Sequence, residues 1–399
     1  MALWNAATTE ADAAAAYLPN ITDDGGTTWG MSIPQRTTAV KGNMTSNEEL
    51  SALDRILLLS DDQQALAKSV QRPMGFIFAT FAIPLALCNV IVFSQRNMRS
   101  APGTYVIALN VGQITCTFLK TLEIALTEML DEPTSHYGFC FYQSYVSVFG
   151  GLLVAKRGSF VILCLSSVER LYAVLRPFHI QNFVLSKHPV PLVLAVYSLS
   201  FIWNLYYLTM FRLAMVADGG KTACAYVLTE LFLKDPDLMY AFGLAARIML
   251  SYVSLATQLV LSALTVWALR RHNMATKHVQ SSASDDIKRQ QERQLSVTLL
   301  GASVSFVVLS LPRVFLNVFS SAFPEFFRGK KYSNLFLVLD DFTFNLMVLG
   351  CGVDFFCYLG LSSRYRQTLI SILPCKRFRS LVSDSKALSV TVDSELSTQ

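Results

Sequence analysis

Charge is scarce in this sequence. Asp, Glu, Lys and Arg make up 15% of the 399 residues, whereas soluble domains usually carry about 25%. A wholly disordered chain is excluded, because disorder requires low hydrophobicity and high net charge. The 19 glycines are too few for collagen, and the 8 cysteines are too few for a small disulfide-stapled domain. A formal net charge of +5 gives no basic surface for nucleic acid, so no nucleic-acid partner is expected.

Catalytic signatures are also missing. The chain has no Walker, Gly-x-Ser-x-Gly or His-Glu-x-x-His pattern, and its 5 histidines fall in predicted loops without clustering. We therefore expect no enzymatic activity, no cofactor and no metal site. A transporter or channel is a less favoured alternative, because no internal repeat relates the two halves of the chain.

The residues that replace charge are apolar, at 52% of the chain with a mean hydropathy of +0.41. About 20 apolar residues in a helix cross a hydrocarbon core of about 30 Å. The apolar blocks here are longer and more continuous than the alternating segments of about 10 residues in membrane β-barrels. The sequence thus predicts an all-α membrane protein with a seven-transmembrane helix bundle. The predicted helices span residues 74–95, 103–127, 141–168, 190–211, 238–269, 295–320 and 333–359.

The distribution of charge predicts the orientation of this bundle. Lys and Arg collect on the cytoplasmic side, in short loops near the helix ends. With the N-terminus outside, the inner segments hold 17 basic and 7 acidic residues, and the outer segments hold 11 basic and 17 acidic residues. We therefore expect a multi-pass protein of the plasma membrane with an extracellular N-terminus and a cytoplasmic C-terminus.

Two segments outside the bundle, which itself spans residues 73–375, are predicted to be disordered. Residues 1–72 are rich in Ala, Thr, Gly, Asp and Asn and contain two glycosylation acceptors, Asn20 and Asn43. They show no signal peptide, so the first transmembrane helix is expected to act as the targeting signal. Residues 376–399 form a Ser/Thr-rich cytoplasmic tail.

The cysteines divide by their surroundings. Cys140 and Cys224 are the only pair predicted to lie outside the membrane on the extracellular side, where disulfides form, so we expect a bridge between them. Cys375 lies just inside the membrane after an amphipathic stretch and is a candidate for palmitoylation, with an unmodified thiol as the alternative.

The end of the third predicted helix carries the clearest functional pattern. Residues 164–178 read CLSSVERLYAVLRPF. This resembles the inner end of helix three in the rhodopsin family of G-protein-coupled receptors, an Asp/Glu-Arg-Tyr triplet followed by x-x-Val/Ile-x-x-Pro. Glu169, Arg170 and Pro177 match that spacing, and Leu171 replaces the usual Tyr.

The resemblance implies a switch at the inner edge of the membrane. Arg170 would be held by Glu169 or released to face a heterotrimeric G protein, and Phe178 would be an apolar plug into the G-protein surface. For an isolated Glu-Arg pair the alternative is a helix-end ion pair with snorkelling side chains.

Other helices extend the resemblance over roughly residues 73–375. Asn89 matches the Gly-Asn-x-x-Val pattern of helix one, and a buried Asn at that depth needs hydrogen-bond partners. Pro312 would kink helix six and provide a pivot for movement of its inner half. Asp354 and Tyr358 match Asn/Asp-Pro-x-x-Tyr in helix seven. Tyr365 matches the position of the aromatic residue in the family's short amphipathic eighth helix.

The sequence also departs from the family. Gln113 stands where the family has the Asp that anchors an internal sodium ion, so no sodium-dependent inhibition is expected. Cys140 precedes Arg170 by 30 residues, more than is typical, which predicts a third helix that is longer at its top or bent near Gly150-Gly151. Three further positions differ from the family pattern: Tyr197, Ser310 and Phe355.

Ionisable residues within the predicted helices mark a candidate ligand pocket, since such residues are costly in a membrane and usually line a cavity or pair with each other. The alternative is a set of structural ion pairs, for example Lys120 with Asp340 or Asp341. Apart from Arg247 in the fifth helix, the candidate ligand residues are Lys120, Glu123, Lys156, Arg157, Arg313, Asp340 and Asp341.

The chemistry of this pocket indicates the class of ligand. Residues 146–161 contain no Asp, which disfavours a monoamine, and the basic side chains favour a carboxylate or an amide-rich ligand. Residues 311–319, LPRVFLNVF, resemble invertebrate FMRFamide-like neuropeptide receptors. The leading hypothesis is a peptide-activated, G-protein-coupled receptor, with an orphan or small-molecule seven-helix receptor as the alternative. In such a receptor the tail would be a substrate for receptor kinases and arrestin, or else a plain disordered terminus.

Overall fold

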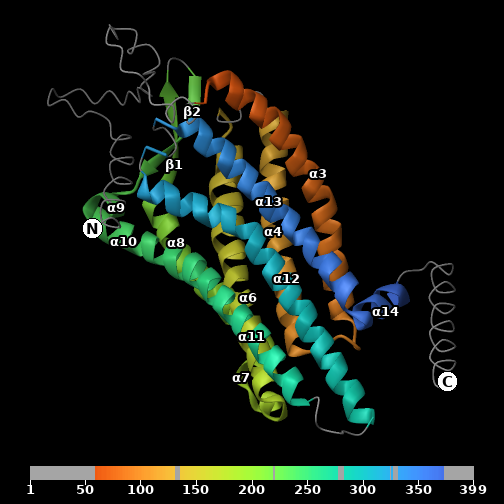
Figure 1. Cartoon of the computed structure of the whole chain (residues 1–399). Coiled ribbons are helices and arrows are strands. Elements are labelled where there is room, and N and C mark those ends of the chain that lie inside the picture. The colour runs from red at the N-terminus through yellow and green to blue at the C-terminus, as the bar shows by residue number, and fades with distance from the viewer. Residues whose placement is uncertain are drawn as a thin grey trace, which may run out of the picture.

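The protein is a bundle of seven long helices, crossing side by side in Figure 1. The computed structural model describes residues 59–130, 135–218, 221–276, 283–323, 325–326 and 331–372. The predicted Asn20, Asn43 and Cys375 lie outside these residues. The helix α13 packs against both α12 and α3, so the last long helix closes the ring against the first. The predicted all-α, seven-helix class is confirmed.

The long helices follow the chain in the predicted order, and the third and fifth are each built from several segments. They are α3 (Asp61–Ser94), α4 (Ala101–Met129), α5 (Tyr137–Phe141) with η3 (Tyr142–Lys156) and α6 (Arg157–Leu175), α8 (Pro189–Met210), α10 (Pro236–Arg247) with η5 (Ile248–Val253) and α11 (Ser254–Thr276), α12 (Ala283–Ala322) and α13 (Ser333–Leu361). The shorter elements are η4 (Pro177–Asn182), α7 (Val184–Lys187), β1 (Phe211–Asp218), β2 (Lys221–Leu228), α9 (Glu230–Lys234) and α14 (Ser363–Ile372).

The first helix begins at Asp61 rather than at residue 74. Ser60 caps it by accepting a hydrogen bond from the Gln63 amide at 3.2 Å, and the Gln63 side chain accepts one from the Ser60 amide at 3.0 Å. This reciprocal capping box fixes the start of the helix, and Arg72 on its outer part pairs with Glu128 on α4. Residues 61–72, which the sequence placed in the disordered N-terminal segment, are therefore helical.

Six of the seven helices are long and apolar enough to cross a membrane by composition, and α4 is the exception. Its polar residues account for the difference in composition. Many of them are buried against neighbouring helices rather than exposed to lipid. Asn110, Gln113 and Glu123 are each at most 6% exposed. Shielding by the other helices thus lets α4 carry polar groups that a lipid-facing helix would not tolerate.

The N-terminal half of the third helix is wound as a π-helix over Tyr142–Lys156 and becomes α-helical at Arg157. A π-helix pairs each amide with the carbonyl five residues back, so it holds more residues in each turn than an α-helix. This winding accommodates the long separation between Cys140 and Arg170 and includes Gly150-Gly151, where the sequence predicted a longer or bent helix.

Side chains of α8 bind backbone oxygens just before the π-helix ends. The Ser200 hydroxyl donates to the Val154 carbonyl at 3.2 Å, and the Asn204 amide donates to the Leu153 carbonyl at 3.3 Å. Both polar residues are fully buried, although α8 as a whole is mostly exposed on the outside of the bundle. The fourth helix therefore stabilises the change of winding in the third.

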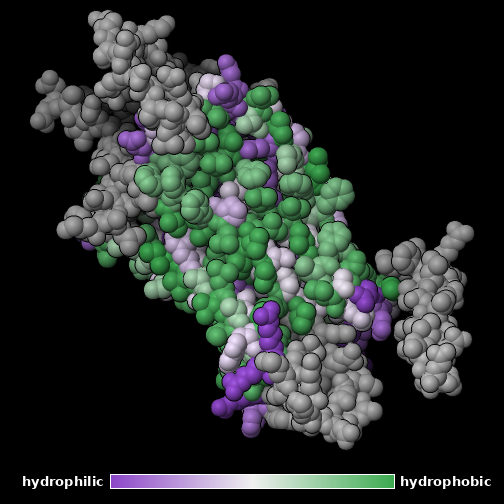
Figure 2. All heavy atoms as spheres, viewed as in Figure 1, coloured by the Kyte–Doolittle hydropathy of each residue, from purple (hydrophilic) through white to green (hydrophobic). Residues whose placement is uncertain are grey.

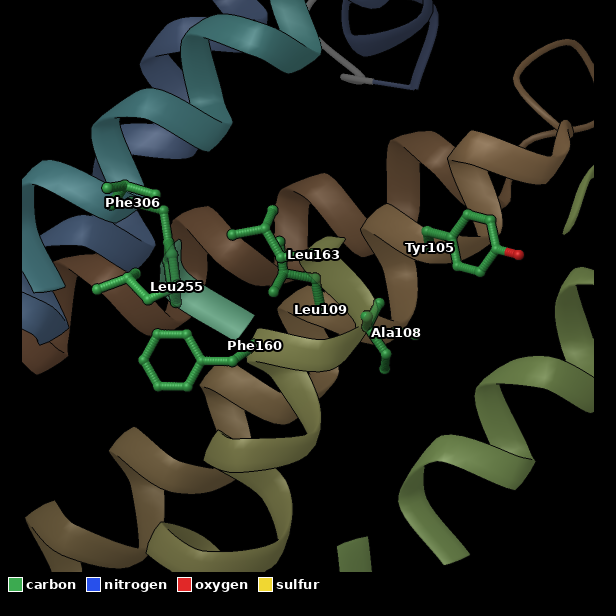
Figure 3. Close-up of a cluster of buried hydrophobic side chains, with 9 residues drawn as sticks. Tyr105, Ala108, Leu109, Phe160, Leu163, Leu255 and Phe306 are labelled. Atoms are coloured by element: carbon green, nitrogen blue, oxygen red, sulfur yellow. The ribbon is translucent and has the colours of Figure 1, made fainter. Parts of the chain in front are cut away.

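A close junction of three helices explains the residue Tyr197. Its hydroxyl donates to the Ala108 carbonyl of α4 at 2.9 Å, across the surface of α6. A Cβ added at Gly112 would come within 2.5 Å of the Tyr197 hydroxyl, and one at Gly158 within 2.7 Å of its ring. The two glycines therefore make the space that the tyrosine needs. Beside this junction, Figure 3 shows side chains of α4, α6, α11 and α12 meeting in the apolar core.

The surface divides into an apolar middle and hydrophilic ends. Figure 2 shows green, hydrophobic residues over the central part of this face and purple residues towards its ends. The lipid-facing side chains that are exposed include Phe81 on α3, Phe201 on α8 and Trp267 on α11. This arrangement fits a bundle that crosses a hydrocarbon layer with its polar groups outside that layer.

A β-hairpin that the sequence did not predict lies between the fourth and fifth helices. Strands β1 and β2 pair antiparallel from Phe211↔Leu228 to Asp218↔Lys221. The two intervening residues in the sequence are Gly219 and Gly220, a dipeptide favoured in two-residue hairpin connections. The alternation of strands was hidden because the segment directly continues an apolar helix.

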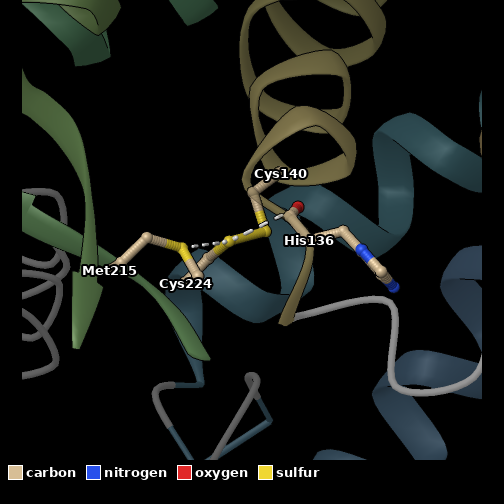
Figure 4. Close-up of a disulfide and its surroundings, with 4 residues drawn as sticks. All are labelled: His136, Cys140, Met215 and Cys224. Atoms are coloured by element: carbon tan, nitrogen blue, oxygen red, sulfur yellow. Dashed lines mark hydrogen bonds between the residues drawn. A yellow bond between two sulfur atoms is a disulfide. The ribbon is translucent and has the colours of Figure 1, made fainter. Parts of the chain in front are cut away.

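The predicted disulfide is confirmed. Cys140, in the first turns of the third helix, is bonded to Cys224 on β2, and their Cα atoms are 6.4 Å apart. Figure 4 shows the bridge beside His136, which precedes the helix, and beside Met215 on β1. The hairpin is thereby fixed over one end of the bundle.

The bridge provides the first prediction. Cys224→Ser should lower the amount of folded protein at the cell surface, because loss of a native disulfide typically costs about 2–5 kcal/mol. Surface labelling and the thermal midpoint of the purified protein measure the effect. Cys164→Ser is the matched control, since a serine hydroxyl can still donate to the Ser254 carbonyl as the thiol does at 2.8 Å. Equal surface amounts for both variants and the wild type would contradict the prediction.

Candidate functional site

Two of the predicted switch residues, Glu169 and Arg170, lie together near the C-terminal end of α6. Glu169 and Arg170 are 3% and 8% exposed, and the Glu169 carboxylate is 3.2 Å from the Arg170 Nε atom. The other carboxylate oxygen of Glu169 accepts a hydrogen bond from the Ser186 hydroxyl at 3.1 Å. The acid is thus shared between the arginine and the loop that follows the helix.

That loop is attached to the bundle at two further places. The Tyr105 hydroxyl on α4 donates to the Leu185 carbonyl at 2.9 Å. The rings of Tyr172 and Phe183 are stacked with centroids 4.1 Å apart. These contacts position Ser186 beside Glu169, which the sequence pattern did not indicate. Pro177 and Phe178 begin the turn η4, but their side chains are outside what the structure describes.

Asn89 belongs to a buried polar network that joins the first, second and eighth helices. Its amide donates to Asn110 Oδ1 at 3.0 Å, and Asn89 Oδ1 accepts from the Tyr365 hydroxyl at 2.7 Å. All three residues are 0% exposed. Burial raises the pKa of the Tyr365 phenol above its ordinary value, so this hydroxyl remains a donor. The predicted need of Asn89 for partners is thereby met.

Aromatic rings surround this network. Tyr358 of α13 lies with its ring centroid 5.1 Å from that of Phe93 and 5.7 Å from that of Tyr365. The short helix α14, which leaves the end of α13 at an angle in Figure 1, is therefore held to the bundle by a buried ring. The predicted short eighth helix is present as α14 with Tyr365 buried, but the sequence could not show the hydrogen bond from Tyr365 to Asn89.

The remaining switch residues lie on α12 and α13. Pro312 is inside α12, where it removes one backbone hydrogen bond. Asp354 is fully buried, and its carboxyl faces Gln113 of α4 without a hydrogen bond of ordinary geometry to it. Asp354 is one turn from Tyr358 on the same helix.

Four of the predicted ligand residues form two ion pairs. The Lys120 ammonium is 2.7 Å from Glu123, which also accepts hydrogen bonds from Gln143 at 3.2 Å and from Ser147 at 2.5 Å. Arg313 binds the Asp340 carboxylate at 3.0 Å and the Asp340 carbonyl at 3.0 Å. The alternative pairing of Lys120 with Asp340 is not the one observed. Asp341, next to Asp340, is partly buried.

Lys156 and Arg157 face different ways, as consecutive residues of a helix must. Lys156 lines a small cavity between α4, α6, α12 and α13, with its ammonium 5.8 Å from the centre of the Phe160 ring. Arg157 instead donates to Asn204 on α8, away from that cavity. The structure thus brings Lys156 towards the centre of the bundle and removes Arg157 from it.

This geometry gives the bundle charged side chains at both ends of one set of helices. One end holds the ion pairs Lys120–Glu123 and Arg313–Asp340, and the other end holds the buried Glu169–Arg170 pair, whose acid also accepts a hydrogen bond from a loop. A ligand that competes for the outer pairs could shift the helices that carry them, and helices transmit such a shift to their inner ends.

Comparison with known proteins agrees with this arrangement. A sequence model described as 7 transmembrane receptor (rhodopsin family) matches residues 85–358. The FMRFamide peptide receptor frpr-18 of Caenorhabditis elegans is 25% identical over 296 residues, which cover 71% of this chain and 65% of that receptor. The match therefore spans less than two thirds of the length of this relative.

The network around Asn89 provides the second prediction. Tyr365→Phe keeps the ring but leaves Asn89 Oδ1 buried without its donor, at a cost of about 1–3 kcal/mol. The thermal midpoint of the purified protein should fall by a few degrees. Tyr172→Phe is the control, because it removes a hydroxyl at the same end of the bundle that makes no hydrogen bond with the described residues. The same midpoint for both variants would refute the role of the hydroxyl.

Proposed function

The chain belongs to the rhodopsin family of seven-transmembrane receptors, whose sequence model covers more than half of it, and we propose that an extracellular peptide activates it to signal through a heterotrimeric G protein. The family consists of membrane receptors and not of enzymes. The observation that carries the proposal is the buried Glu169–Arg170 pair at the inner end of α6, where the family pattern has its switch.

The outer half of the bundle supports a peptide as the ligand. Two ion pairs, Lys120–Glu123 and Arg313–Asp340, offer both signs of charge to amide and carboxylate groups, with Asp341 beside them. A relative that is itself a peptide receptor supports the same ligand class. The contact of Arg157 with Asn204 gives that residue a structural role between α6 and α8 rather than a role in ligand binding.

The inner half supports movement of α12 and α13 on activation. Pro312 weakens α12 at one turn and so provides a pivot for its inner part. Release of Arg170 from Glu169 would then expose the arginine to the G protein, with Pro177 and Phe178 contacting the same partner. Asp354, Tyr358 and Asn89 would reposition the inner part of α13 and the helix α14 that follows it.

The proposal includes the orientation of the chain in the plasma membrane. We place the N-terminal segment, with its acceptors Asn20 and Asn43, outside the cell together with the bridged hairpin. The tail lies inside, where Cys375 is available for palmitoylation and the Ser/Thr-rich segment for receptor kinases and arrestin. The 17 basic residues of the inner segments support this orientation.

A peptide screen tests the proposal. Cells that express the full chain are exposed to matched libraries of peptides with free and amidated C-termini and to a small-molecule library, and calcium and cyclic AMP are recorded. We expect a saturable response to peptides that untransfected cells lack. A response to small molecules alone would contradict the peptide ligand, and a response unaffected by G-protein inhibitors would contradict G-protein coupling.

The switch provides the third prediction. Arg170→Ala should reduce the response to the level of untransfected cells while leaving surface expression largely intact, because it removes the group assigned to the G protein. Arg176→Ala is the control, since that arginine is exposed at the end of the same helix. Signalling by Arg170→Ala at the level of the control would overturn the assignment of Arg170.

A further inference from the structure

Two buried polar side chains near the centre of the bundle lack the hydrogen-bond partners that such groups normally have, and a half-buried lysine near them lacks an ion-pair partner. Both oxygens of Asp354 and both polar atoms of Gln113 are buried without a hydrogen bond. The Lys156 ammonium makes no ion pair with any carboxylate in the described part of the chain. An isolated buried charge is among the most costly features of a protein interior, so the coincidence requires an explanation.

Shared surroundings connect the three side chains in the core. Lys156 and Gln113 line the same cavity, together with Ser159. Gln113 in turn faces the Asp354 carboxyl. Cys351, which also lines the cavity, precedes Asp354 by one turn of α13. The order across the bundle is therefore lysine, cavity, glutamine and carboxyl.

The neighbouring charges are already matched. Lys120 is paired with Glu123, Arg313 with Asp340, and Arg170 lies beside Glu169. In this part of the described core, Lys156 and Asp354 are thus the opposite charges left to compensate each other. The two groups make no direct contact, so something must connect them.

The cavity and Gln113 can provide the connection. About 20 Å³ of the cavity can be occupied by a water-sized sphere, which is enough for about one water molecule. A water there can accept from the ammonium and donate to the Gln113 oxygen, while the Gln113 amide donates to Asp354. The ammonium, both polar atoms of Gln113 and one oxygen of Asp354 then have suitable partners.

We propose that Lys156 is a built-in cation that compensates the buried Asp354 carboxylate, with Gln113 and one water molecule carrying the hydrogen bonds between them. Lys156 is then a positioning residue that fixes Asp354, and through it the inner part of α13. This compensation goes beyond the proposed function and does not depend on which ligand the protein binds.

The proposal predicts how the core responds to a mobile cation. In Lys156→Ser the carboxylate loses its built-in partner, and the shorter side chain leaves room for a sodium ion. The thermal midpoint of the purified full-length protein in choline chloride should fall by roughly 5 °C, and NaCl at equal ionic strength should restore it in a saturable manner. The wild type should have the same midpoint in both salts, as should the exposed-lysine control Lys187→Ser.

The double variant Lys156→Ser/Asp354→Asn separates charge compensation from packing. It retains neither charge, so it should have no dependence on sodium and a midpoint above that of Lys156→Ser in choline chloride. If Lys156→Ser fails to fold, the double variant should still recover folded protein.

Three results would overturn the proposal. They are a sodium-dependent midpoint in the wild type, no difference between the two salts for a folded Lys156→Ser, and a double variant no more stable than Lys156→Ser in choline chloride. All readouts are thermal midpoints without ligand, so a failed peptide screen would not affect them.

Discussion

Each polar group buried among the seven helices must find its partner within the protein, because hydrocarbon offers no hydrogen bonds to replace those of water. This constraint shapes the third helix, where Ser200 and Asn204 of α8 bind carbonyls beside the end of the π-helix. It also explains why many polar side chains of α4, the long helix that is not apolar enough to cross a membrane by composition, are buried against its neighbours. The order of the helices, the winding of the third helix and the close approach of neighbouring helices thus depend on polar contacts as well as on apolar packing.

The same constraint links structure to function. Charged groups are retained at two levels, the outer pairs such as Arg313–Asp340 and the inner pair Glu169–Arg170. At several of these sites the two interacting residues lie on different helices, or one of them lies on a loop. A molecule that competes for one residue therefore changes the packing of the helix or loop that carries the other. Lys156, Gln113 and Asp354 lie between the two levels and, in our account, connect them. Ion pairs can therefore stabilise the resting state of a receptor, and binding of a ligand or a G protein can replace them with other contacts.

Much of this was accessible from the sequence. Long apolar blocks predicted the seven helices, and the pattern around Glu169 and Arg170 indicated the family, because both patterns are local along the chain. The hydrogen-bond partners of the site residues were harder to predict from the sequence. Ser186 beside Glu169 and Tyr365 beside Asn89 depend on how distant segments pack, and no local pattern encodes that. The hairpin was missed because its apolar strands directly follow a helix. Lys120 pairs with Glu123 on its own helix rather than with Asp340 or Asp341, which were named as examples of possible ion-pair partners.

The central claim is that a peptide bound at one end of this bundle activates a G protein at the other. Its most direct test is the rate of GDP–GTP exchange on purified heterotrimeric G proteins, measured with the full-length protein reconstituted in lipid bilayers and with pooled free-acid and amidated peptides. The account predicts that at least one peptide pool accelerates exchange only when the protein is present. An exchange rate that no pool changes, with any G-protein class and with folded protein in the bilayer, would contradict it.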